Sequence, residues 1–259
     1  MNNQQESRPT ALITGASYGV GAATALSLAR QGHNVALTAT KCSNLDKTRS
    51  AAEALGVRVA TLELDLTAQA SIEAAVDQAV AELGRLDVLV NNAGAHGRKP
   101  ALDITREDWD AIFEPNLTGT FFLTQKFGRH LIEAKRPGSI VSITSTHAVR
   151  GAPFRLMYGV SKAAIHQVTQ MLAIEWAPHG IRVNAVAPGR MMTDSPTRQQ
   201  TANDPNYVEA MLKKIPLHRM PTAEDCAAAV TFLCSPGAAS ITGQVLLIDG
   251  GLTVQGSAS

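Results

Sequence analysis

The stretch ALITGASYGVGAATALSLARQG, residues 11–32, decides the expected fold. Its first four residues form an apolar run of the length of a short buried strand. After Gly21, Ala and Leu recur at helical spacing, and Gly32 is a typical helix end. A strand that passes through a glycine-rich turn into a helix is the first unit of a doubly wound α/β fold.

The same alternation of strand and helix continues along the chain. Further strands are predicted at residues 34–39, 57–64, 86–91, 139–143, 181–187 and 244–248. Helices are predicted at about residues 45–55, 69–83, 106–134, 157–176 and 223–234. We therefore predict a single Rossmann-type doubly wound domain over residues 9–259, with a seven-stranded parallel sheet and helices on both faces.

Composition and charge exclude several classes of function. The 259 residues are 45% hydrophobic and 17% charged, as is usual for a globular protein with a sizeable core. A net charge of +1 gives no reason to expect nucleic acid or an anionic membrane as partner. No apolar run approaches the roughly 18 residues that span a bilayer. The polar start MNNQQESRPT is not a secretory signal. We expect a cytoplasmic protein whose residues 1–8 form a disordered tail.

The cysteines and histidines form no familiar metal or disulfide pattern. Cys42, Cys226 and Cys234 are odd in number and widely spaced, so we expect reduced thiols. The seven histidines include no HxH or HExxH motif. We therefore expect no metal site.

Gly15, Gly19 and Gly21 lie where the first strand becomes a helix. Such a turn offers backbone N–H groups and the positive end of a helix dipole to a pyrophosphate. The spacing is GxxxGxG rather than GxGxxG, so the glycines could also serve loop geometry alone. Ser17 completes a GxSxG match, the nucleophile elbow of hydrolases, but too few residues precede it to supply the required upstream strand and oxyanion loop.

The second predicted strand indicates which dinucleotide is preferred. An acid that would bind the 2′-hydroxyl of NAD is absent between Val35 and Leu45. Thr38, Thr40 and Lys41 could instead accept a 2′-phosphate, with Lys41 supplying the charge. We expect NADP as the preferred cofactor and NAD as the alternative. If Lys41 is only a solvated loop residue, the choice stays open.

Tyr158 and Lys162 form a candidate general acid/base. Apolar residues recur at helical spacing from Met157 to Trp176, which places the two side chains one turn apart on the same face. A phenol titrates near pH 10, but a neighbouring ammonium stabilises the phenolate and lowers that pKa. The pair could therefore transfer a proton at neutral pH. Taken alone, a Tyr and a Lys four residues apart are also common surface neighbours.

Several motifs occur together and in one order: TGASYGVG at 14–21, NNAG at 91–94, and the spaced trio Ser145, Tyr158 and Lys162. With them the chain resembles the short-chain dehydrogenase/reductase family, and it is similar to 3-oxoacyl-carrier-protein reductases and to polyol and gluconate dehydrogenases. The resemblance implies an NAD(P)-dependent oxidoreductase that transfers a hydride between the cofactor and a carbonyl or secondary alcohol. We expect it to reduce a small polar ketone or oxoacyl substrate.

The resemblance also implies catalytic roles. Tyr158 would give a proton to the carbonyl during reduction and act as the base during alcohol oxidation. Lys162 would lower the pKa of Tyr158 and hold the nicotinamide ribose. Ser145 would hydrogen-bond the substrate oxygen. Asn116 would position a water that leads from Lys162 to solvent, unless it caps a kink at Pro115.

Further residues would bind the cofactor by resemblance. Asp65 would accept the adenine amino group beside the Leu66 backbone, and Asn92 would either line the adenine ribose or stabilise the sheet. The segment NAVAPGRMMT would orient the nicotinamide carboxamide. The full expected set is Gly15, Ser17, Tyr18, Gly19, Val20, Gly21, Thr38, Thr40, Lys41, Asp65, Leu66, Asn92, Ala93, Gly94, Tyr158, Lys162, Pro188, Gly189 and Thr193.

Basic side chains border the expected cleft and predict a polar or anionic substrate, unless they are solvated loop charges. They are His96, Arg98, His147, Arg150, Arg155 and Arg190. The insert at about residues 190–220 has the mixed polarity of a substrate lid. The resemblance implies a homotetramer. The alternative to an enzyme is a non-catalytic nucleotide-binding regulator of the same fold, a class that usually lacks the tyrosine or the lysine.

Overall fold

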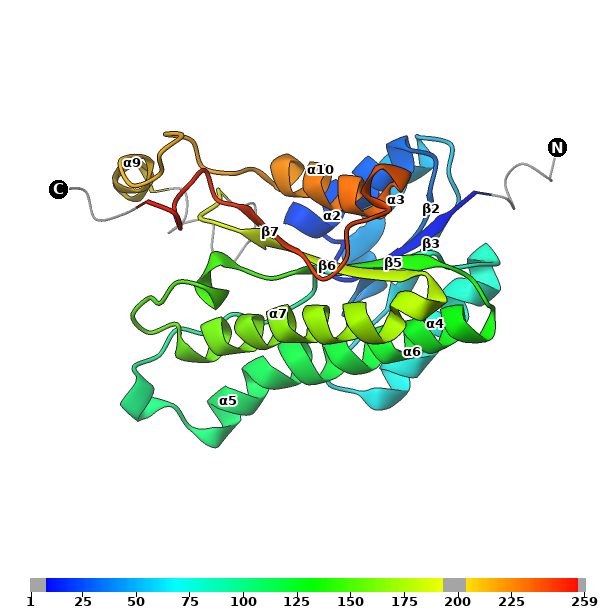
Figure 1. Ribbon diagram of the computed structural model, residues 1–259, viewed down its shortest axis with the longest axis horizontal. Helices are drawn as coiled ribbons and strands as arrows, with labels where there is room; N and C mark the ends of the chain where they lie inside the picture. Colours follow the sequence, from blue (N-terminus) through cyan, green and yellow to red (C-terminus); the bar gives the residue numbers. More distant parts are fainter. Residues whose placement is uncertain (1–7, 193–203, 256–259) are drawn as a thin grey trace.

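Seven parallel strands form one sheet in the order β3-β2-β1-β4-β5-β6-β7 (Figure 1). The computed structural model describes residues 8–192 and 204–255. The strands are β1 (Thr10–Ile13), β2 (Asn34–Ala39), β3 (Val59–Glu63), β4 (Val88–Asn91), β5 (Gly138–Ile143), β6 (Ile181–Pro188) and β7 (Val245–Ile248). The predicted α/β fold class with a doubly wound parallel sheet is confirmed.

Helices cover both faces of the sheet (Figure 1). One layer contains α2 (Gly19–Arg30), α3 (Asp46–Glu53) and α10 (Ala223–Cys234). The other contains α4 (Gln69–Leu83), α5 (Arg106–Phe113), α6 (Gly119–Glu133) and α7 (Leu156–Trp176). Because successive strand residues point to opposite faces, Leu12 packs in the core beneath α4, α6 and α7, whereas Ile13 packs in the core beneath α2 and α10. Each strand is thus buried on both sides.

The long helix expected at residues 106–134 is interrupted, so its predicted continuity is wrong. Between α5 and α6 the chain forms one π-helical turn, η3 (Glu114–Thr118). Pro115 has no N–H to donate to the helix ladder, and the N–H of Gly119 reaches back five residues to the carbonyl of Glu114. The hydroxyl of Thr120 donates to the Pro115 carbonyl at 2.9 Å. The wider turn sets the direction of Asn116.

The ends of the predicted domain are partly described. Residues 1–7 of the expected tail lie outside the described residues, whereas Arg8 donates from Nη1 to the Gly56 carbonyl at 2.8 Å and is not a free tail residue. Of the expected lid, residues 193–203 also lie outside, and the short helix α9 (Pro205–Leu212) belongs to the part that is described. None of the described helices is both long and apolar enough to cross a membrane.

The order of strands reverses between β1 and β4, because chain continuation from β1 runs toward β2 and β3 while β4 continues toward β5, β6 and β7. The loops that follow β1 and β4 therefore diverge to opposite faces of the sheet and leave a crevice at the carboxyl ends of these strands. Ligands bind at this point in open α/β sheets, so the fold indicates where the site should lie.

Close packing between α6 and the loop after β3 gives the first prediction. A Cβ atom added at Gly119 would lie 1.8 Å from the carbonyl oxygen of Leu66. We expect Gly119→Ala to lower the free energy of unfolding by about 2–3 kcal/mol in urea denaturation, even though alanine favours a helix by about 1 kcal/mol. Gly151→Ala is the control, because no atom lies within 4 Å of its added Cβ. Equal stability of the two variants would contradict this packing.

Candidate active site

A cavity of about 1070 Å³ opens at the crevice. This volume is at the upper end of the range for small-molecule sites, about 300–1,000 Å³. The predicted site residues that line it are Gly15, Ser17, Tyr18, Gly19, Val20, Thr38, Thr40, Asn92, Ala93, Gly94, His96, Ser145, His147, Arg155, Tyr158, Lys162, Pro188, Gly189 and Arg190. Those that do not line it are Gly21, Lys41, Asp65, Leu66, Asn116 and Arg150. Thr193 lies outside the described residues.

The glycine turn after β1 is required by backbone geometry and by space. Gly15 and Gly19 have φ angles of 63° and 58°, in the left-handed region that other residues rarely adopt. A Cβ atom at Gly21 would lie 2.2 Å from the Gly15 carbonyl oxygen and 2.5 Å from Nδ2 of Asn92. Gly21 therefore supports the turn from behind, while Gly15 and Gly19 face the cavity.

The N-terminus of α2 fits an anionic group. Its N-cap residue, Tyr18, makes no side-chain capping hydrogen bond, and the first turn contains no acidic residue. The first N–H groups of a helix have no partner within the helix, and the helix dipole makes this end positive. Gly19 and Val20 line the cavity at this end. The residues present can thus hold the pyrophosphate of a dinucleotide.

Asn92 ties β4 to the glycine turn. Its side-chain Nδ2 donates to the carbonyls of Thr14 and Gly15, both at 2.9 Å. The Thr14 hydroxyl accepts from the backbone N–H groups of Asn92 and Ala93, also at 2.9 Å. Of the two roles that the sequence left open for Asn92, these bonds favour stabilisation of the sheet edge.

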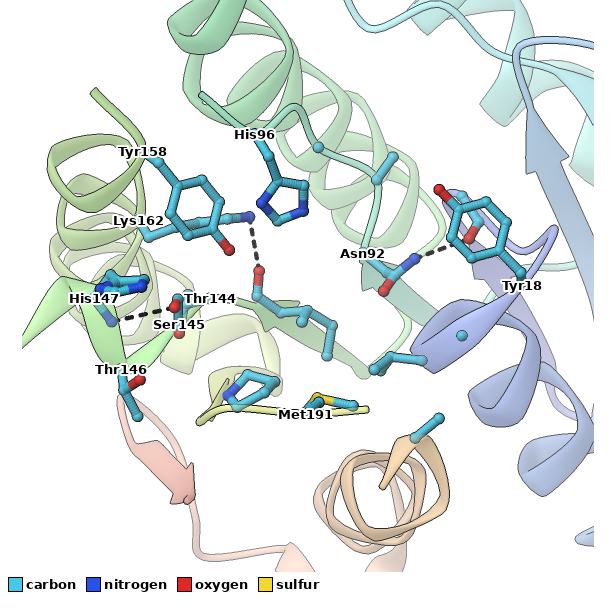
Figure 2. Close-up of a pocket in the computed structure, with 18 of the residues that line it drawn as sticks. Tyr18, Asn92, His96, Thr144, Ser145, Thr146, His147, Tyr158, Lys162 and Met191 are labelled. Carbon is cyan, nitrogen blue, oxygen red and sulfur yellow. Dashed lines mark hydrogen bonds between the residues drawn. The ribbon is translucent and has the colours of Figure 1, made fainter. Parts of the chain in front are cut away.

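Tyr158 and Lys162 lie at the opposite end of the cavity from Tyr18 and Asn92 (Figure 2). Both side chains are buried in the first turns of α7, with 8% and 6% of their surface exposed. The Lys162 ammonium lies 5.9 Å from the centroid of the Tyr158 ring and donates to the Ile143 carbonyl at 3.0 Å. This burial separates the pair from the common surface neighbours that a Tyr and a Lys at this spacing often are.

Aromatic contacts hold the Tyr158 ring in place. The ring of His96 lies 4.6 Å from it in a tilted arrangement, and the ring of His147 lies 6.0 Å away, edge to face. Ser145 follows β5 and is also buried. Its hydroxyl accepts from the backbone N–H of His147 at 3.1 Å. The phenol and the hydroxyl of Ser145 thus belong to one wall of the cavity (Figure 2).

Burial lowers the pKa of Lys162 from 10.5 to about 8. An ammonium without water around it loses solvation, and the hydrogen bond to Ile143 replaces only part of it. A negative charge next to Lys162 would recover this loss. The site therefore favours an anion, such as a phenolate, beside the lysine.

Asn116 joins the loop after β4 to α7. Its Oδ1 accepts from the backbone N–H of Ala95 at 2.6 Å, and its Nδ2 donates to the Ala95 carbonyl at 2.9 Å and to the Ser161 hydroxyl at 3.1 Å. None of these bonds caps the kink at Pro115, so that alternative is wrong. Asn116 does not reach the cavity, but it stands directly behind Gly94, where an added Cβ would lie 2.8 Å from Oδ1.

The end of the cavity near β2 is lined by neutral polar side chains. Thr38 and Thr40 lie there as expected, together with Asn44, which the sequence did not single out. Lys41 is exposed and does not line the cavity, because the chain turns outward after β2 into a short 3-10 helix that begins at Cys42. The predicted 2′-phosphate contact of Lys41 is therefore not formed in this arrangement.

Asp65 and Leu66 lie just outside the cavity wall, which Leu64 forms instead. The Asp65 carboxylate accepts from the backbone N–H of Thr67 at 2.8 Å and from its hydroxyl at 2.7 Å. These two bonds hold the pKa of Asp65 below its usual value. Leu66 is buried in the core. The expected adenine contact of Asp65 remains a prediction.

The basic residues expected at the cleft line the cavity with one exception. Those that line it are His96, Arg98, His147, Arg155 and Arg190. Arg150 does not, because its Nη1 donates to the Leu252 carbonyl at 3.0 Å and so holds the C-terminal segment. The cavity wall also contains residues that sequence reasoning missed because they lie in irregular loops or in α9, namely Phe154, Met191, Met192 and Tyr207. Within the described ranges, no three His, Cys, Asp or Glu side chains gather as metal ligands would.

Comparisons with known proteins agree with this geometry. A protein-family model described as enoyl-(acyl carrier protein) reductase matches residues 15–253. Gluconate 5-dehydrogenase of Gluconobacter oxydans is 35% identical over 94% of this chain and 94% of its own length. 3-Oxoacyl-(acyl-carrier-protein) reductase of Thermotoga maritima is 38% identical over 94% of this chain and 97% of its own.

A solved structure gives the same result. A crystal structure described as a putative 2-deoxy-D-gluconate 3-dehydrogenase from Agrobacterium tumefaciens with bound NADP superimposes with a TM-score of 0.87 at 32% identity. The match covers 98% of this chain and 100% of that one. The expected resemblance to oxoacyl reductases and gluconate dehydrogenases is confirmed.

The buried lysine predicts a pH-dependent stability. The folded-state pKa of Lys162 is about 8, below the unfolded value of 10.5, so the unfolded chain binds more protons between these values. The free-energy cost of burial, about 3 kcal/mol, is therefore present below pH 8 and disappears as the pH rises toward 10.5. Lys162→Met removes this cost.

We expect the stability difference between Lys162→Met and the wild type to shift by about 2–3 kcal/mol, in favour of the wild type, between pH 7 and pH 10. Urea denaturation at both pH values measures it. The control is Lys47→Met, at an exposed position of α3, which should show no such shift. A difference that does not change with pH would mean that Lys162 is not buried as a titrating ammonium.

Proposed function

The chain belongs to the short-chain dehydrogenase/reductase family, oxidoreductases that act on alcohols and ketones with a nicotinamide cofactor, and on this premise we propose that Tyr158 is its general acid and base. One observation carries the proposal. A phenol and an ammonium are buried together on one wall of a cavity whose other end is an uncapped helix N-terminus. The pair combines a proton donor with the charge that stabilises its conjugate base.

In reduction, Tyr158 gives its phenolic proton to the carbonyl oxygen, and in alcohol oxidation it takes the proton back. Lys162, held by the Ile143 carbonyl, stabilises the phenolate that remains after reduction. The Ser145 hydroxyl donates to the substrate oxygen, since it already accepts from the His147 N–H. A bound nicotinamide dinucleotide supplies or accepts the hydride.

Asn116 is a positioning residue in this proposal. Its bonds to both backbone groups of Ala95 fix the loop that passes in front of Lys162, and its bond to Ser161 fixes that loop to α7. This geometry supports the predicted role in leading a proton path from Lys162 toward solvent. The path itself, through a water held near the loop, is part of the proposal.

The cofactor would lie with its pyrophosphate at the glycine turn and its nicotinamide near Tyr158. The turn and the N-terminus of α2 hold the phosphates, and Pro188 and Gly189 line the cavity where the carboxamide would sit. We propose NADP as the preferred form. Supporting it, no acidic residue among the described residues lines the end near Thr38 and Thr40, and a related structure contains NADP.

The substrate in this proposal is a small polar ketone or oxoacyl compound. Tyr158 and Lys162 lie one turn apart, the spacing expected for reduction of C=O rather than C=C. Tyr207 of α9 lines the cavity, which supports a covering role for the insert. A nucleotide-binding regulator without activity is the alternative; the joint burial of Tyr158 and Lys162 argues against it. A cytoplasmic location stays part of the proposal.

The proposal includes a homotetramer. Large apolar side chains are exposed on the outer face of α7, at Val160, Met171 and Ile174, and on the edge strand β7, at Leu246 and Leu247. Apolar surfaces of this kind often mark contacts between subunits. Two separate faces on one chain allow the two kinds of two-fold contact that a tetramer of dihedral symmetry needs.

Removal of the phenolic hydroxyl tests the proposed acid. We expect Tyr158→Phe to lower kcat for reduction of a ketone by NADPH about 100- to 10,000-fold, because general acid catalysis contributes this much. NADPH affinity, measured by calorimetry, should be unchanged. Tyr18→Phe is the matched control, since it removes a phenol at the glycine end of the cavity and should keep turnover. Full activity of Tyr158→Phe would assign the proton to another group.

The assembly is checked by size-exclusion chromatography with light scattering. We expect a mass near four times the 27.3 kDa of one chain. Ile174→Glu, a charge on the exposed face of α7, should reduce that mass to a dimer or monomer. A wild-type mass of 27.3 kDa would exclude the tetramer.

A further inference from the structure

Three arginines and a histidine gather at the Tyr158 end of the cavity. Arg98 lies in the loop after β4, Arg155 precedes α7, Arg190 follows β6, and His147 lies in the short helix after β5. All four line the same cavity. Segments far apart in the sequence thus bring positive charge to one place.

This charge has no acidic partner in the part of the chain that the structure describes. None of the described cavity-lining residues is Asp or Glu, and none of the three arginines takes part in an ion pair there. Burial, followed by the charges of Arg190 and Arg98, lowers the pKa of Arg155. Burial, followed by Arg190 and Arg155, lowers the pKa of His147. The residues repel one another, which disfavours the folded state unless an anion is bound.

The local structure holds this unfavourable cluster in place. The Arg155 guanidinium is half-buried and donates to the Gly97 carbonyl at 3.3 Å. The Arg98 guanidinium lies 5.5 Å from the centroid of the Phe154 ring. Phe154 has a φ angle of 64°, which is strained for a bulky residue, and its ring lines the cavity. Strain of this kind is concentrated at ligand sites.

Resting on the function proposed above, we propose that the cluster binds an anionic group of the ketone substrate, a carboxylate or a phosphate, with Arg155 as its principal contact. The guanidinium fork matches both anions through paired hydrogen bonds. Because Arg155 precedes Tyr158 by three residues, an anion on Arg155 holds the substrate at the wall that contains the proton donor. The preferred substrates are then oxo acids or phosphorylated ketones.

Neither the cofactor phosphates nor ordinary surface charge accounts for the cluster as well. The phosphates of the dinucleotide have their own site at the glycine turn, and Figure 2 shows Tyr18 and Asn92 at the opposite end of the cavity from Tyr158 and His147. Ordinary solvated arginines would lie at the surface, as Arg30 does at the end of α2, whereas Arg155 is half-buried.

Matched substrate pairs test the anion site. We would compare a 3-oxo acid with its methyl ester, and dihydroxyacetone phosphate with dihydroxyacetone, in NADPH-dependent reduction by the wild-type enzyme. We expect kcat/KM for the anionic member of at least one pair to exceed that of its neutral partner at least tenfold. The pair that shows the preference identifies the carboxylate or the phosphate.

The variant Arg155→Gln should then remove the preference. We expect a loss of tenfold or more in kcat/KM for the anionic member, mainly through KM, with the neutral member and NADPH affinity unchanged. Arg30→Gln, which removes one positive charge far from the cavity, is the control and should leave the preference intact. Equal loss for both members of a pair in Arg155→Gln would refute the anion site.

The outcomes separate this inference from the function on which it rests. If the wild type reduces neutral ketones as well as their anionic partners, the anion site is wrong and the role of Tyr158 stands. If no carbonyl is reduced, the enzymatic proposal fails, and calorimetry with the acid and its ester in the presence of NADP decides the anion site by itself. Binding of the acid that is lost in Arg155→Gln would support it, and equal binding of the ester would refute it.

Discussion

The structure depends on one electrostatic constraint, an ammonium buried beside a phenol. Lys162 is almost without solvent and has the Ile143 carbonyl as a hydrogen-bond partner. At a separation of roughly 6 Å and an effective dielectric constant of ~20, two opposite unit charges attract by about 3 kcal/mol, or on the order of two pKa units. A phenolate at Tyr158 would therefore offset most of what burial costs the lysine. The two groups titrate as a coupled pair rather than separately.

The fold holds this pair against the cofactor end through a few specific bonds. β5 ends at Ile143, whose carbonyl fixes Lys162, and α7 presents Tyr158 and Lys162 one turn apart. The π-helical turn at Pro115 directs the Asn116 amide to the loop after β4, which closes the back of the site. The strand-order reversal at β1 and β4 then opens the glycine turn toward the same cavity. The basic cluster extends the cavity on the far side of Tyr158.

Much of this arrangement is predictable from the sequence, because it depends on local periodicity. The strand at Asn34–Ala39 and the helices at Gln69–Leu83 and Ala223–Cys234 begin and end as predicted. The prediction of a continuous helix through Pro115 is wrong, since periodicity reports which face is buried and not which hydrogen bond a proline removes. The outward turn of Lys41 has the same kind of cause, a loop direction that no pattern of residues determines.

Tertiary hydrogen bonds are the other part that the sequence could not supply. Arg150 is a cleft residue by its position in the sequence, yet it bonds to Leu252 about a hundred residues later in the chain. Asn92 could be a ribose contact by its motif, yet its amide is used by Thr14 and Gly15. Motif spacing identifies the right segments, whereas the partners of individual polar groups follow only from the packed structure.

Tyrosinate absorbance tests the central interaction most directly, because the chain contains only three tyrosines. Subtracting the titration of Tyr158→Phe from that of the wild type isolates the ionisation of Tyr158. A midpoint well below the ordinary tyrosine pKa of about 10 is the result expected if the buried ammonium stabilises the phenolate. A midpoint at or above that value would show that Lys162 does not prepare Tyr158 for proton transfer.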